Sequence, residues 1–220
     1  MSEATQTPSL EQTLNKTDFG HSLLENKNAL IAAVVSVLIV VTGYTFWKQM
    51  KHKAGLEIAQ EVYAFESQTW SSAKEGKLDL TEAAKKFEAL GTEVHESASI
   101  VPVALDMGQF MYQKNALNEA EAVLSKVTSS DALVTFFVGM QRAVILEKMN
   151  KIPEAIAVLE NIAKNKETLM AAKVNLELGR LNLALGEKGK AQTHLEYVAQ
   201  TFPNDENAKL AKLYLTKLAQ

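Results

Sequence analysis

Apolar and polar positions divide the chain into two very different parts. Residues 28–47 are twenty consecutive residues without a charge, NALIAAVVSVLIVVTGYTFW. As a helix rising 1.5 Å per residue, a run of this length spans about 30 Å, the thickness of the hydrocarbon core of a bilayer. Lysines flank the run, and aromatic residues gather at its end, as is typical of a membrane interface. The pattern predicts a transmembrane helix over residues 28–48, with a tail of residues 1–27 before it and a polar region of residues 49–220 after it.

Two other interpretations of this apolar run fit it less well. A buried core helix is seldom apolar on every face over such a length. A cleaved signal peptide has an apolar region of about 7–15 residues after a basic segment and ends at a small-residue cleavage site. Here the preceding tail is net acidic and the run ends in bulky aromatic side chains. We therefore interpret the run as an uncleaved signal-anchor.

The lysines around the run bear on its orientation. Lys48, Lys51 and Lys53 follow it closely, whereas Lys16 and Lys27 precede it. The positive-inside rule leans slightly towards a cytoplasmic location for the region after the run. A difference of one charge leaves the topology open.

The region after the run reads as helix after helix, because Gly and Pro are scarce and Ala, Leu, Glu and Lys dominate. Its small residues recur with a long period. Ala120, Ala155 and Ala191 lie 35 and 36 residues apart, and a leucine follows each of them four residues later. A period of this size is typical of a solenoid of helical hairpins.

The predicted fold is all-α, a single N-terminal transmembrane helix followed by about four helical hairpins and a capping helix. The expected hairpins cover about residues 54–92, 99–128, 132–165 and 169–202, and the capping helix covers residues 205–219. Asn204 or Asp205 can cap this last helix. Its apolar side chains are expected to cover the end of the stack, and they are Leu210, Leu213, Leu215 and Leu218. A generic helical bundle with accidental spacing is the alternative.

The hairpins resemble the tetratricopeptide repeat. In the fourth, Leu178 and Gly179 stand at the Leu-Gly pair of that motif, and Ala191 stands at its central alanine. In the third, Ala143 replaces the glycine and Arg142 stands where a leucine is expected, which leaves the register of this hairpin open. The small residues are expected to let the two helices of a hairpin approach each other, and the leucines to fill the space between successive hairpins.

The first helices of the hairpins are expected to present a concave face. With the registers above, its residues are Leu105, Gln109, Tyr112, Phe137, Met140, Val144, Leu176 and Arg180. Such a face is apolar with a few polar groups and suits an extended or partly unfolded polypeptide. The alternative is a central buried helix over residues 132–146, which are apolar nearly all round.

Composition and motifs give little support to catalysis. The chain has no cysteine, which excludes disulfides and thiolate metal sites. A net charge of −3 and a pI near 5.9 indicate no basic surface for nucleic acid. The four histidines are scattered, and no metalloprotease, nucleophile-elbow or nucleotide-binding motif occurs. His95, between Glu93 and Glu96, is expected on the solvated surface rather than at a metal ion. We expect a protein that is not an enzyme and that has no cofactor or metal.

A second resemblance covers most of the chain. It rests on Asn28-Ala29-Leu30 at the start of the run, the aromatic exit Tyr44–Trp47, the turn Glu75-Gly76-Lys77 and the segment Ala83–Phe87. With its short tail, single anchor and one repeat domain, the chain is similar to the YfgM-like family of ancillary subunits of the bacterial SecYEG translocon. This resemblance implies a single-pass protein of the bacterial inner membrane, with a cytoplasmic N-terminus and a periplasmic repeat domain. The lysine balance around the anchor departs from that topology.

The expected function follows from the anchor, the repeats and this resemblance. We expect a membrane-anchored protein-interaction module, an accessory subunit of the Sec translocon that links emerging secretory polypeptides to periplasmic chaperones. Its expected partners are the membrane, the SecYEG translocon, periplasmic chaperones and unfolded or extended polypeptides, without nucleic acid. The alternative is a tetratricopeptide scaffold or adaptor of another cell-envelope assembly complex.

Overall fold

The computed structural model of the protein describes residues 53–164 and 170–218. The chain divides into two compact units, residues 1–56 and residues 57–220, and residues 53–56, which are helical, are the described part of the first. The predicted transmembrane segment, residues 28–48, lies outside the described residues. Within the described ranges, no helix combines the length and apolarity needed to cross a bilayer. These ranges contain helices and no strand, which confirms the all-α class for this part of the chain.

The second unit begins with a helix that changes its winding. Residues 57–64 are α-helical, η1 (Phe65–Trp70) is a π-helix, and α4 (Ser71–Lys74) is again an α-helix. A π-helix bonds residue i to residue i+5. Phe65 and Trp70, five residues apart, are therefore both directed into the core. The second helix of this hairpin is α5 (Leu80–Glu88), which Asp79 caps by accepting a hydrogen bond from the Thr81 amide at 2.8 Å.

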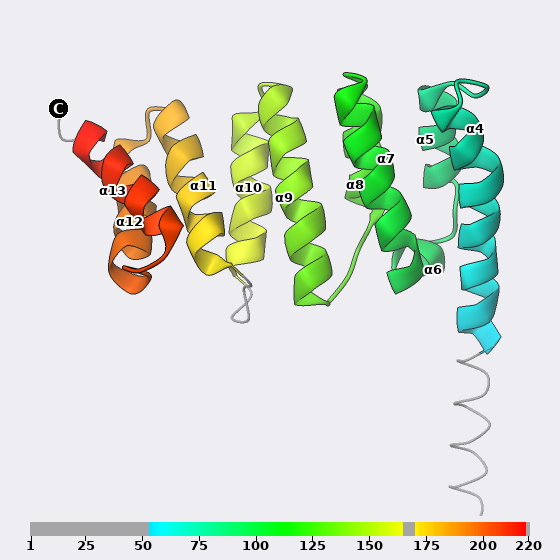
Figure 1. Cartoon of the computed structure of the whole chain (residues 1–220), viewed down its shortest axis with the longest axis horizontal. Coiled ribbons are helices and arrows are strands. Elements are labelled where there is room, and N and C mark those ends of the chain that lie inside the picture. Colours follow the sequence, from blue (N-terminus) through cyan, green and yellow to red (C-terminus); the bar gives the residue numbers. More distant parts are fainter. Residues whose placement is uncertain (1–52, 165–169, 219–220) are drawn as a thin grey trace, which may run out of the picture. The chain divides into compact units, whose positions relative to one another are not determined.

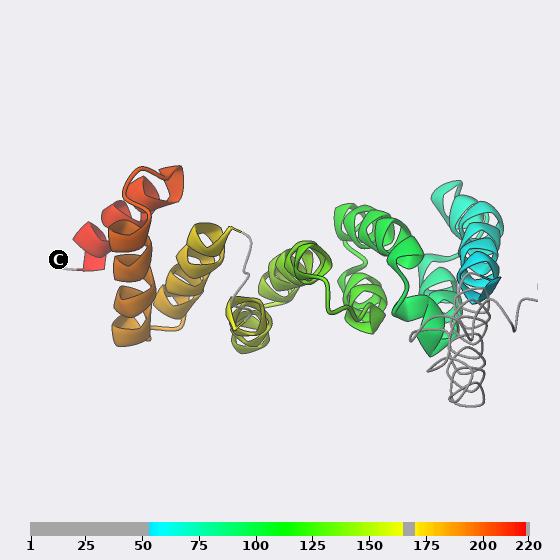
Figure 2. The same ribbon diagram turned by 90° about the horizontal axis from the view of Figure 1, so that it is seen from below.

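Three further hairpins and a last helix follow along the chain (Figure 1). The short α6 (Thr92–His95) and η2 (Ala98–Ile100) lead into the second hairpin. The hairpins are α7 (Val101–Gln113) with α8 (Leu117–Lys126), α9 (Ala132–Lys148) with α10 (Ile152–Ala163), and α11 (Ala171–Ala184) with α12 (Lys188–Thr201), before α13 (Glu206–Leu218). In the described residues of this unit, the packed helices belong to one hairpin or to hairpins adjacent in sequence, and α13 packs on the fourth hairpin (Figure 2).

Each hairpin turns at one residue in the left-handed backbone conformation. These residues are Gly76, Asn115, Asn150 and Gly186, with φ of 73°, 62°, 60° and 80°. Glycine enters this region without steric cost and asparagine does so more easily than other residues with a side chain. A left-handed residue after a helix bonds back to the last carbonyls and so ends the helix. The four turns therefore share one backbone conformation that ends the first helix of the hairpin.

Close packing inside the hairpins confirms the role expected for the small residues. A Cβ added at Gly108 would lie 2.7 Å from Cδ1 of Leu124, and one added at Gly179 would lie 2.6 Å from Cγ of Leu195. Ala120, Ala155 and Ala191 are fully buried on the facing helices. In the third hairpin Gly139 also approaches its partner helix, since its Cβ would lie 2.7 Å from Cδ1 of Ile162.

The interior consists of three hydrophobic clusters, and α9 belongs to two of them. Val138 and Ile145 of α9 join the cluster formed by the first two hairpins. Phe136 and Leu146 join a second cluster with α10 and α11. The third cluster lies among α11, α12 and α13. The alternative prediction for residues 132–146 is a central buried helix. α9 does contact two clusters, but one of its faces is exposed to solvent.

Two sequence predictions are corrected here. His95 is buried, with 6% of its surface exposed, and its Nε2 lies 3.0 Å from the Phe87 carbonyl oxygen while its ring packs on that of Phe87. The short α6 directs it inward against α5. On α13, Ala208 and Ala211 rather than Leu210 and Leu213 face the stack, and these two leucines are 48% and 51% exposed.

Asp205 is one of the two residues predicted to cap α13. Its carboxylate accepts a hydrogen bond from the backbone N–H of Asn207 at 2.7 Å. Leu215 and Leu218 do pack partly against the third cluster. The small side chains of Ala208 and Ala211 allow α13 to approach α11 and α12 closely, and the helical period places Leu210 and Leu213 on the other face.

Candidate functional site

Only some residues of the predicted concave face are exposed on the surface. On α7, Gln109 is exposed, while Leu105 and Tyr112 are half-buried against the first cluster. The Lys148 ammonium lies 4.3 Å from the centre of the Tyr112 ring. The prediction that Leu176 lines this face is wrong, because its side chain is only 3% exposed and lies in the third cluster with Leu195. It contributes to the core and does not line a surface.

An apolar stripe runs along the solvent face of α9. Leu133, Phe137 and Val144 are 51%, 52% and 46% exposed, and the half-buried Met140 lies between the last two. Their spacing of four, three and four residues places them on one side of a helix. We call these four residues the α9 stripe. Leu133 was not among the residues predicted from the sequence, although the same spacing would have identified it.

A hollow of about 230 Å³ lies between α9 and α11 at the end of the stripe. It brings together three of the predicted residues, Met140, Val144 and Arg180. The full lining is Met140, Ala143, Val144, Glu147, Leu159, Lys173, Glu177, Arg180 and Leu181. Its floor is apolar and its charged residues form the rim.

The rim of this hollow is a network of four charged side chains. Arg180 donates from Nη1 and Nη2 to the two carboxylate oxygens of Glu147 at 2.6 and 2.7 Å. Its Nε donates to Oε2 of Glu177 at 2.7 Å, and Lys173 donates to Oε1 of the same carboxylate at 2.7 Å. The two positive and two negative groups balance, so the rim has no net charge. The Arg180–Glu147 pair also joins the third hairpin to the fourth.

The pKa shifts in this network favour the charged forms. Burial alone would raise the pKa of Glu177, but hydrogen bonds from Lys173 and Arg180 outweigh it and hold the pKa below the ordinary value. The hydrogen bonds from Arg180 to Glu147 raise the pKa of the guanidinium. Glu177 and Arg180 therefore stay ionised near neutral pH, and the network stays intact.

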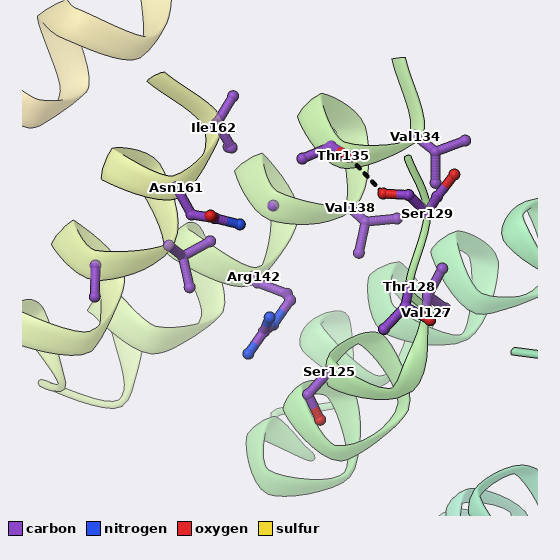
Figure 3. A pocket seen from close by; sticks show the side chains of 13 residues that line it. Ser125, Val127, Thr128, Ser129, Val134, Thr135, Val138, Arg142, Asn161 and Ile162 are labelled. Atoms are coloured by element: carbon purple, nitrogen blue, oxygen red, sulfur yellow. Dashed lines mark hydrogen bonds between the residues drawn. The ribbon is translucent and has the colours of Figure 1, made fainter. Parts of the chain in front are cut away.

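A second hollow, of about 400 Å³, lies between α8 and α10 beside residues 127–131 (Figure 3). No residue of the predicted face lines it. Thr135 of α9 donates a hydrogen bond to the Ser129 carbonyl at 3.2 Å across one side of it. The lining residues are Ser125, Val127, Thr128, Ser129, Val134, Thr135, Val138, Gly139, Arg142, Ala157, Val158, Asn161 and Ile162.

Arg142, which lines this second hollow, explains the irregular third repeat. It occupies the position where a leucine is expected, and its Nη2 lies 2.6 Å from Oε1 of Glu121 in the preceding hairpin. Ala143 beside it is buried in the second cluster, as expected for the small position of the repeat. An arginine is accommodated here because a carboxylate of α8 neutralises it.

The chemistry of the described residues is that of a binding surface. Within residues 53–164 and 170–218, no three His, Asp or Glu side chains gather as they would around a metal ion. The charged groups at the first hollow are paired with one another, Arg142 at the second is paired with Glu121, and the exposed groups of the α9 stripe are apolar. Stacked helical hairpins with such a stripe define the class of helical-repeat proteins that bind other proteins.

The family match identifies this class more closely. Residues 23–166 match the tetratricopeptide repeat-like domain, and the chain belongs to this family. Domains of this kind are typically non-catalytic protein-interaction modules. The matched range includes the apolar run near the N-terminus and ends just after α10, so the fourth hairpin lies beyond it. No curated protein matches the chain.

Proposed function

We propose that the chain is a membrane-anchored interaction module of the Sec translocon. In this role it holds apolar segments of emerging secretory polypeptides and presents them to periplasmic chaperones. The observation that carries the proposal is the α9 stripe, because three large apolar side chains about half exposed on one helix face favour a protein ligand. Extended or unfolded segments expose the apolar side chains that such a stripe can bind.

The position of the apolar run supports the membrane part of the proposal. The run precedes the repeats, and the family match covers the run and the first three hairpins. An anchor keeps the repeats close to the membrane and raises their effective concentration near a translocon, so weak individual contacts suffice. The proposed location is the bacterial inner membrane, with the N-terminus in the cytoplasm and the repeats in the periplasm.

Labelling of single cysteines tests the topology. The chain has no cysteine, so one can be introduced at Ser9 in the tail or at the exposed Ser130 between α8 and α9. Cells with a permeabilised outer membrane are treated with a maleimide that does not cross the inner membrane. We expect labelling at Ser130 and none at Ser9. The reverse result would place the repeats in the cytoplasm and rule out the chaperone role.

Purification in mild detergent tests the partners. We expect SecYEG subunits to co-purify with the full chain and to be lost when residues 1–47 are deleted. Photo-cross-linking from α9 should capture secretory polypeptides, and the double variant Phe137→Ser, Val144→Ser should reduce their capture severalfold. The matched control is Leu213→Ser, an equally exposed leucine on α13. Partners from one other envelope assembly would instead support the scaffold function.

A further inference from the structure

We propose that the hollow between α9 and α11 is an anchor pocket for one large uncharged side chain of the bound polypeptide. We call it the anchor pocket. This inference rests on the proposed function and specifies the kind of segment that binds. The segment is extended and places one aromatic or branched aliphatic residue, rather than a charged one, in the pocket.

The size and the floor of the pocket suit such a side chain. Met140, Ala143 and Val144 of α9, Leu159 of α10 and Leu181 of α11 contribute apolar groups. The volume is about 230 Å³. An apolar cavity of about 150 Å³ in another protein is enough to bind benzene. The pocket therefore has room for a phenyl ring or a leucine side chain, and burial of either stabilises the complex through the hydrophobic effect.

The charges of the rim determine what the pocket excludes. Arg180 has three of its N–H groups committed to Glu147 and Glu177, and Lys173 is also bound to Glu177. A carboxylate of a ligand would meet Glu147 and Glu177 beside these cations, so repulsion offsets the attraction. A lysine of a ligand would meet carboxylates that are already paired. Either charge would lose part of its hydration and gain little net attraction from a rim whose charges balance, which costs free energy.

The pocket continues the α9 stripe and is not isolated from it. Val144 and Met140 belong to both, and Val144 lies 46% exposed at the boundary. A segment that covers Phe137 and Met140 therefore reaches the pocket at Val144. Successive side chains of an extended segment point to opposite sides. One anchor side chain can then enter the pocket while its neighbours along the segment face away.

The test combines changes in the ligand and in the protein. The full chain in lipid nanodiscs is titrated with three fluorescent peptides that share an otherwise uncharged sequence and differ only in a central Phe, Ala or Glu. With the wild-type protein we expect the Phe peptide to bind roughly tenfold more tightly than the Ala peptide, and the Glu peptide to bind more weakly than either. Val144→Trp, which fills the mouth of the pocket, should remove the difference between Phe and Ala.

Two further variants separate the pocket from the stripe. Val144→Ser keeps the pocket open but makes its mouth polar, and it should weaken the Phe peptide more than the Ala peptide. Phe137→Ala, on the stripe but outside the pocket, should weaken both peptides by the same factor. A thermal melt of each variant verifies that it is folded.

The outcomes distinguish this inference from the proposed function. If the peptides bind but the Phe-to-Ala ratio is the same in wild type and in both Val144 variants, the anchor pocket is refuted and peptide binding by the stripe stands. Preferred binding of the Glu peptide refutes the selection against charge. If no peptide binds at any concentration tested, the proposed function and the pocket both fail.

Discussion

Gly179 marks the place where the two helices of the fourth hairpin come into direct contact. A side chain there would overlap with Leu195, which is fully buried and cannot turn away into solvent. Gly189, at the start of the next helix, has open space around the position of its missing Cβ. The same substitution at these two residues therefore separates the effect of a steric clash in the core from the effect of restricting the backbone of the unfolded chain.

We predict that Gly179→Ala lowers the free energy of unfolding by about 1–3 kcal/mol, because Leu195 must shift in a packed core. Gly189→Ala is the matched control and should be neutral or stabilising by up to about 1 kcal/mol, since alanine restricts the unfolded chain. Urea unfolding followed by circular dichroism measures both. Equal effects of the two substitutions would contradict the packing role of Gly179.

The residues predicted successfully are those that obey the repeat. Gly108 and Gly179 could be assigned because each precedes its leucine by the same number of residues. Arg142 breaks the pattern, and its partner Glu121 lies in another hairpin, so no local signal indicates the pair. The burial of His95 likewise depends on how the short α6 packs against α5, which periodicity does not determine.

Among the elements, α11 and α12 are joined by a hydrogen bond as well as by packing. Nδ1 of His194 lies 2.9 Å from Oδ1 of Asn175. The Asn175 amide group donates to the Ala171 carbonyl, so its oxygen faces the ring and Nδ1 carries the hydrogen. Burial lowers the pKa of His194, and the negative charge of Glu160 opposes this only in part. Burial thus favours the neutral form of this half-buried imidazole.

We predict that this hairpin loses stability in mild acid. Because the pKa of His194 is lower in the folded chain than its ordinary value of 6.5, its contribution is complete above that value. It is lost as the pH falls through the folded pKa, where the half-buried ring must accept a charge. Thermal melts of wild type and His194→Gln between about pH 7.5 and pH 5 measure the difference, and the variant should show the smaller decline. Parallel curves would exclude His194 as the cause.

At the scale of the folded unit, the three clusters form a series. The first two share α9, and the second and third share α11, so each hairpin depends on its neighbours in sequence. The last hairpin is covered by α13, whose Ala208 and Ala211 are fully buried. A destabilising substitution at this end should therefore unfold only the helices that contact one another there.

We predict that Ala211→Asp unfolds α11–α13 locally while the first two hairpins remain protected. The cause is an unpaired carboxylate placed in the third cluster. Lys212→Asp, at an exposed position on the same helix, is the control for charge and should leave the pattern unchanged. Hydrogen exchange read by mass spectrometry resolves the hairpins. Uniform loss of protection along the described residues would show that the stack unfolds as one unit.

The overall class of the fold was predictable from the sequence, whereas the candidate site was predictable only in part. The period of about 35 residues indicated helical hairpins without reference to any distant contact. To predict the binding face, one must know how the first helix of each hairpin is rotated about its own axis. On α9 that rotation leaves Phe137 and Val144 exposed, but on α11 it turns Leu176 into the third cluster. The ion network of Arg180 requires Glu147 from the preceding hairpin, so it appears only once the hairpins are stacked.

The restriction of contacts to sequence neighbours also has a consequence for how the chain acquires its structure. A fold made of local contacts has low contact order, and such folds form quickly because little loop-closure entropy is lost before each contact. A chain produced from its N-terminus can complete each interface between hairpins as soon as the next hairpin emerges. Only α11 and α12 must wait for the last residues, since α13 completes their cluster. Vectorial folding of this kind leaves little apolar surface open to aggregation during synthesis.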